Sequence, residues 1–114
     1  YAIQLFDAAE KNKIKLFTSS HAIATAYYIL NKATDDKTLR EILDNLMDYI
    51  QPIAVDKQIL KRALNSRHKD FEDGVQIVAA STINDISHIV TRNIKDFKFS
   101  EIPVVTPDQA VMLI

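Results

Sequence analysis

Short apolar segments alternate with longer amphipathic segments along the whole of this sequence. The short segments predict strands at residues 14–18, 53–55, 89–91 and 103–105. The amphipathic segments predict helices over residues 1–12, 21–32, about 37–51, 57–64 and 70–82, and a last helix that begins at Pro107. Short buried strands separated by helices are typical of a parallel sheet that is covered on both faces. The sequence therefore predicts an α/β fold with a doubly wound parallel sheet, whose ligand site lies at the carboxyl ends of the strands.

Several local signals fix the expected helix ends. Ser19 or Ser20, Asp56 and Asp70 stand where a polar side chain can cap the following helix. The strongest amphipathic stripe runs from Leu39 through Leu43 and Met47 to Ile50, and Pro52 is expected to end that helix. In the helix that starts at Asp70, the expected inward residues are Phe71, Val75, Val78, Ala79 and Thr82.

The composition excludes several kinds of functional site. The chain has no cysteine, which excludes disulfides, zinc ribbons, thiolate nucleophiles and iron–sulfur clusters. Gly74 is the only glycine, whereas the phosphate-binding loops of nucleotide-binding proteins need several. The formal net charge of −1 gives no sign of a strongly cationic surface. A local cluster of basic residues is usually a solvated face, but beside a metal site it can hold a phosphate backbone; its members here are Lys61, Arg62, Arg67 and Lys69.

The length of 114 residues predicts one domain over residues 1–114. No apolar run is long enough for a membrane span and no signal peptide is visible, so we expect a cytoplasmic protein with no membrane contact. The sequence opens at Tyr1 inside a helical pattern, without a preceding strand. We therefore expect these residues to be part of a longer protein.

Acidic residues gather where the helix over residues 70–82 begins. Asp70 and Asp73 are three residues apart, so on a helix they point the same way. One interpretation is simple capping, because free backbone N–H groups at a helix start stabilise carboxylates. The other is a site for a hard divalent cation, since Mg²⁺ and Mn²⁺ prefer carboxylate oxygens.

A second polar group follows the predicted strand at 89–91. Here Thr91, Arg92, Asn93, Lys95 and Asp96 lie where parallel sheets bind ligands. Asn and Asp are also favoured in turns for backbone reasons, so the turn alone explains part of this pattern. The two polar groups together indicate one cation site assembled from distant segments.

The stretches 70–80 and 89–97 resemble the PIN domain family in order and spacing. The segments 16–19 and 102–107 match that family's second and closing strands, so the resemblance covers essentially the whole chain. It implies an α/β fold with a parallel sheet. It also implies the activity of many family members, which are metal-dependent ribonucleases that include the toxins of VapBC-type toxin–antitoxin pairs.

The resemblance implies a site for Mg²⁺ or Mn²⁺. The family's metal ligand at the helix start falls on Asp73, with Asp70 as a helper. Its acidic position after the strand falls on Asn93, and Asp96 supplies the charge that Asn93 lacks. The expected catalytic residues are therefore Asp70, Asp73 and Asp96, and the expected metal ligands are Asp73, Asp96 and Asn93.

The resemblance also implies a substrate and partners. RNA is the expected substrate, with Thr91, Arg92 and Lys95 as its expected contacts. An antitoxin protein and a second copy of this chain are the expected protein partners.

Two acidic positions of the family differ in this sequence. Thr25 stands where the family usually has Glu, on the helix after the second strand. The family's first acid ends an opening strand, and this sequence begins after that point. We therefore expect weak metal binding and an exposed middle of the sheet. Two functions stay open: a Mg²⁺-dependent ribonuclease that hydrolyses RNA phosphodiester bonds, and a catalytically inert PIN fold that binds RNA or a protein.

Overall fold

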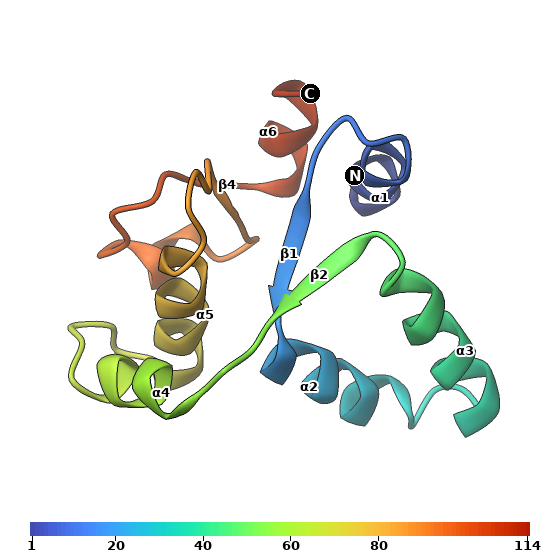
Figure 1. Cartoon of the computed structure of the whole chain (residues 1–114), viewed down its shortest axis with the longest axis horizontal. Helices are drawn as coiled ribbons and strands as arrows, with labels where there is room; N and C mark the ends of the chain where they lie inside the picture. Colours follow the sequence, from blue (N-terminus) through green and yellow to red (C-terminus); the bar gives the residue numbers. More distant parts are fainter.

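Helices and short strands alternate in the structure, a computed structural model that describes residues 1–114 (Figure 1). The helices are α1 (Ala2–Glu10), α2 (Ser20–Leu30), α3 (Asp36–Leu46), α4 (Lys57–Leu64), α5 (Phe71–Ser81) and α6 (Pro107–Met112), with one 3₁₀ turn, η1 (Ile94–Phe97). The strands are β1 (Leu16–Ser19), β2 (Ile50–Ile53), β3 (Ile89–Val90) and β4 (Val104–Val105). The alternation predicted from the sequence is confirmed.

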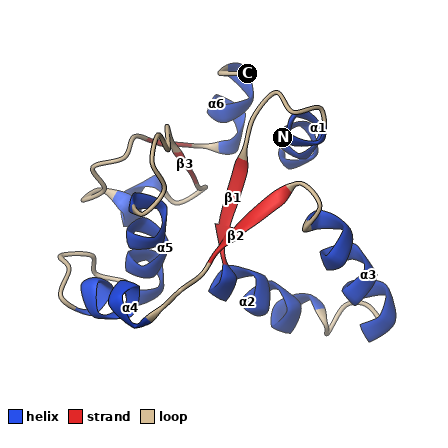
Figure 2. Cartoon of the chain, viewed as in Figure 1, coloured by secondary structure: helices blue, strands red, loops and turns tan.

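All strand pairs are parallel. β1 pairs with β2, with Leu16 opposite Ile50, and β3 pairs with β4, with Ile89 opposite Val104. Parallel strands joined through helices confirm the α/β class (Figure 2). Hydrogen bonds join the strands into two separate pairs, because no ladder connects β1 to β3.

The end of the third helix differs from the prediction. α3 ends at Leu46, and Ile50 lies in β2 rather than on the helix stripe. Pro52 lies inside β2, opposite Thr18, and does not end a helix. A proline fits there because β2 pairs with β1 on one side only and its other edge is free. The N–H that proline lacks is not needed for a hydrogen bond at that free edge.

Side-chain caps fix the starts of four helices, as the sequence predicts for three of them. The carboxylates of Asp56 and Asp70 accept the N–H groups of Ile59 and Asp73 at 2.9 and 3.0 Å. Ser19 caps α2, while the hydroxyl of Ser20 accepts the N–H of Val55 and joins α2 to the chain after β2. The fourth cap is Asp35, at the start of α3.

The buried core lies between α4 and α5. Its members are Ile59, Ala63, Val75, Val78 and Ala79, against which Ile53 and Val55 pack. Two predicted core residues are wrong: Phe71 is 43% exposed, and Thr82 lies on the surface just after α5. Phe71 is the first residue of α5, where the helix has only begun to pack on its neighbours.

Figure 1 shows β1 and β2 between α4 and α5 on one side and α3 on the other. α1 and α6 pack together near the ends of the chain, and α2 packs on α3. None of these helices combines the length and the apolar composition needed to cross a bilayer.

Candidate active site

The candidate site begins at the first turn of α5. Asp70 is the N-cap residue, and its carboxylate accepts the N–H of Asp73 at 3.0 Å. Capping is therefore the contact that the structure gives Asp70. The same contact fixes its carboxylate beside the first turn, so capping and a role in the site are compatible.

Asp73 is the most perturbed acid in this region. Burial raises the pKa of its carboxyl above the ordinary value, because a partly buried carboxylate loses hydration. The negative charges of Asp70, Asp96 and Glu72 raise this pKa further. Three of these four acids, Asp70, Asp73 and Asp96, are the expected catalytic residues. We refer to Asp70, Glu72, Asp73 and Asp96 below as the carboxylate cluster.

Asp96 reaches this cluster through η1, which packs on α5. The turn before η1 is fixed by two hydrogen bonds: Asn93 N–H donates to the hydroxyl of Thr91 at 3.1 Å, and Asp96 N–H donates to the carbonyl of Asn93 at 3.0 Å. Thr91 N–H donates to the carbonyl of Val105 at the end of β4, which anchors the turn to the second strand pair. The fold thus brings residues 73 and 96 together from distant parts of the sequence.

The cations expected to contact substrate lie on the same turn. Arg92 and Lys95 are exposed, and neither takes part in an ion pair. Asn93 is exposed as well, so its side-chain amide is accessible from solvent. The hydroxyl of Thr91 accepts the Asn93 N–H, which gives Thr91 a structural contact inside the turn.

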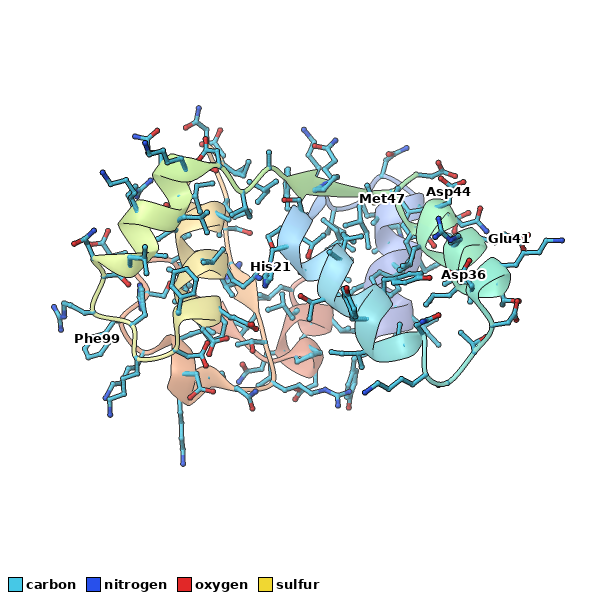
Figure 3. The ribbon with its side chains drawn as sticks, turned by 90° about the horizontal axis from the view of Figure 1, so that it is seen from below. His21, Asp36, Glu41, Asp44, Met47 and Phe99 are labelled. Carbon is cyan, nitrogen blue, oxygen red and sulfur yellow. The ribbon has the colours of Figure 1, made fainter.

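His21 and Glu72 contact each other at the site and were not predicted as site residues from the sequence. His21, in the first turn of α2, has its Nε2 atom 4.0 Å from the Glu72 carboxylate and 3.5 Å from the Thr25 hydroxyl. Figure 3 shows His21 in the middle of the molecule. His21 therefore lies between Thr25 of α2 and Glu72 in the first turn of α5. Glu72 lies within the acidic motif, but no local pattern reveals a contact between two helices about fifty residues apart.

The side chains offer oxygen donors of the kind that Mg²⁺ and Mn²⁺ prefer, from Asp73, Asp96 and Asn93. No group of three or more His, Cys, Asp or Glu side chains is arranged to hold a metal ion. Mg²⁺ usually keeps several water ligands and is bound by one or two carboxylates together with substrate phosphates. The donor set fits a cation held in that manner and does not fit a closed cage of protein ligands.

Surface pockets occur elsewhere on the molecule. One is lined by residues of α1, α3 and β2 and of the turn between α3 and β2, including Glu10, Asp48 and Tyr49. The other lies between α2 and α3. Neither of these two pockets contains a residue of the carboxylate cluster.

Comparison with known proteins places the chain in a family. Residues 1–95 match the family described as PIN domain. Ribonuclease VapC1 of Aquifex aeolicus (strain VF5) is 31% identical over 113 residues, which cover 96% of this chain and 77% of that protein. No solved structure matches the chain. The α/β fold and both comparisons agree, and the chain belongs to the PIN domain family.

Proposed function

We propose that this protein is a ribonuclease that hydrolyses RNA phosphodiester bonds with the help of Mg²⁺ or Mn²⁺. Family membership and the likeness to a protein named as a ribonuclease support the reaction class. The observation that carries the proposal is the packing of η1 on α5. This packing brings Asp96 close to Asp73, whose pKa is raised by burial and by the charges of Asp70 and Asp96. Carboxylates that lie close enough to raise one another's pKa are typical of a site that binds a divalent cation.

Each residue of the site has a distinct part in this proposal. Asp73 and Asp96, with the amide of Asn93, would hold the cation, and Asp70 would add negative charge while it caps α5. A divalent cation held there would supply Lewis-acid chemistry: it would polarise the phosphoryl oxygen and lower the pKa of the attacking water.

The turn before η1 supplies the proposed substrate contacts. Arg92 and Lys95 pair with phosphates of the RNA backbone through their free positive charges. Thr91 orients the turn from which both cations project.

Cleavage of a labelled RNA by the intact protein, with Mg²⁺ or Mn²⁺, tests the proposal. Asp73→Asn keeps the size of the side chain and removes its charge, so we expect the rate to fall by about 100-fold or more. Asp108→Asn is the matched control, because Asp108 lies in the first turn of α6 and outside the cluster. Equal cleavage by the Asp73 variant and the control would contradict the proposal.

One alternative has support of its own: an inert PIN fold that binds RNA or a protein without cleaving it. Thr25 in place of Glu, and the absence of three clustered metal ligands, favour this alternative. Titration of the intact protein with millimolar Mg²⁺ distinguishes the two. Binding that raises the thermal stability favours the ribonuclease, and no binding favours the inert fold.

A toxin of a toxin–antitoxin pair is the biological role that we propose. The name VapC1 of the relative supports it. Its partners would be an antitoxin protein and a second copy of this chain. A toxin that cleaves RNA would act in the cytoplasm, which is the location that we propose.

A further inference from the structure

Two cationic side chains lie over an exposed aromatic ring near η1. The Arg67 guanidinium lies 4.3 Å from the centroid of the Phe99 ring, and the Lys98 ammonium lies 5.0 Å from it. Phe99 is 36% exposed, and Figure 3 shows it at the end of the molecule opposite Asp36 and Asp44 of α3. We call Arg67, Lys98 and Phe99 the basic–aromatic platform.

The positive charges of the platform have no acidic partner. The ion pairs of the protein are Lys11–Asp7, Arg40–Asp36 and the contact of His21 with Glu72. The faces of aromatic rings attract cations but do not neutralise them, so both charges stay available to an anion. The ring also holds two long side chains in place, which lowers the entropy that they lose when a ligand binds.

The platform lies on the same two chain segments as the carboxylate cluster. Lys98 is the residue that follows η1, two positions after Asp96. On the other side, the centroid of the His68 ring lies 6.5 Å from that of Phe99, and a Cβ added to Gly74 of α5 would lie 3.4 Å from the Cβ of His68. Arg67 thus lies in the loop before α5, the helix that carries Asp73. Lys98 and Phe99 lie just after η1, the turn that carries Asp96.

We propose that the platform binds the backbone and one base of single-stranded RNA next to the cleavage site. Phosphate oxygens accept hydrogen bonds from Arg67 and Lys98, and an unpaired base stacks on the exposed part of Phe99. The identity of the nucleic acid rests on the proposed function. Because the platform lies on the same two chain segments as Asp73 and Asp96, we expect the bound strand to run toward these acids. In this proposal the platform positions substrate and takes no part in the chemistry.

Binding of a fluorescent single-stranded RNA to the intact protein, in EDTA to prevent cleavage, tests this inference. The variant Arg67→Ala/Lys98→Ala is expected to bind about 10-fold more weakly. The slope of log affinity against log salt is expected to become shallower by about 0.7 for each phosphate that the variant no longer neutralises. Phe99→Leu keeps both charges and is expected to weaken binding by about 5-fold or more, because a base can no longer stack.

The matched control is Lys37→Ala/Arg40→Ala, which removes the same charge from α3. Arg40 also lies over an aromatic ring, 5.7 Å from the centroid of Tyr27, but it is paired with Asp36. Equal weakening by both double variants would overturn the inference, since only net charge would then matter. Polyglutamate that competes as well as RNA, together with unchanged binding by Phe99→Leu, would also overturn it in favour of an acidic protein partner.

Failure of this inference and failure of the proposed function are distinguishable. RNA cleavage that depends on Asp73, with normal RNA binding by the platform variants, contradicts only the platform. The platform variants could instead bind RNA weakly while the wild-type protein cleaves no RNA in Mg²⁺ or Mn²⁺. That result supports RNA binding by the platform and contradicts the proposed ribonuclease activity. Circular dichroism of each variant checks that the fold is retained.

Discussion

Asp73 shows how a side chain of the candidate site can act against the stability of its own helix. A carboxylate in the first turn of a helix normally gains from the free N–H groups there. At Asp73, burial and the neighbouring carboxylates outweigh that gain, because the pKa is raised. Natural proteins often accept such a decrease in stability where the same charges serve binding or catalysis.

We predict that Asp73→Asn stabilises the protein at neutral pH. A raised pKa in the folded state means that the folded protein holds this proton more tightly than the unfolded chain. Proton binding by Asp73 therefore stabilises the folded state fully below its ordinary pKa of 3.8. This stabilisation is lost as the pH rises through the higher pKa that Asp73 has in the folded protein. Thermal unfolding should show a small increase in Tm for the variant near pH 7, which disappears as the pH falls below that ordinary value. A variant that is less stable than the wild type at every pH would contradict this prediction.

For single residues, the sequence predicts local contacts and misses distant ones. The caps formed by Asp56 and Asp70 could be predicted because a cap and the N–H that it accepts lie three residues apart. The contact of His21 with Glu72 could not, since it depends on how α2 and α5 pack.

Among the helices and strands, the position at which α4 begins determines how α4 packs on α5. α4 begins at the cap formed by Asp56, only three residues after β2 ends at Ile53. α4 then packs Ile59 and Ala63 against α5, whose first turn carries Asp73. The start of α4 therefore supports the element that holds the candidate site.

We predict that Asp56→Ala lowers the stability of the protein by about 1 kcal/mol, because an N–H group at the start of α4 loses its partner. For a domain of 114 residues that corresponds to a decrease in Tm of about 4 °C. Gln58→Ala is the control, since Gln58 is exposed on the same helix and makes no side-chain hydrogen bond in the structure. Chemical denaturation of both variants measures the difference, and equal stability of the two would show that the cap contributes nothing.

The boundary of α3 shows why element ends are harder to predict than element types. The stripe from Leu39 to Ile50 keeps helical spacing across residues 47–49, which form a turn. Ile50 fits that stripe and also fits a strand, and its pairing with Leu16 decides between them. A pairing partner about thirty residues away is not visible in local periodicity.

For the molecule as a whole, the α/β class could be predicted because the alternation of elements alone determines it. The division into two strand pairs could not, because it depends on which strands hydrogen-bond to each other. The carboxylate cluster is likewise a property of the whole fold. Asp73 follows the first strand pair in the chain and Asp96 follows β3, so only the packing of η1 on α5 brings them together.

In this fold, Asp96 lies close enough to Asp73 for its charge to raise the pKa of Asp73, and the account of the site depends on that interaction. An NMR titration tests this interaction most directly. The pKa of the Asp73 carboxyl is measured from its ¹³C shift in the wild type and in Asp96→Asn. We expect a raised pKa in the wild type and a lower pKa in the variant, because the charge of Asp96 helps to raise it. The pKa should stay above the ordinary value in the variant, since burial is the larger cause. An Asp73 pKa that is the same in both proteins would show that the two carboxylates do not interact.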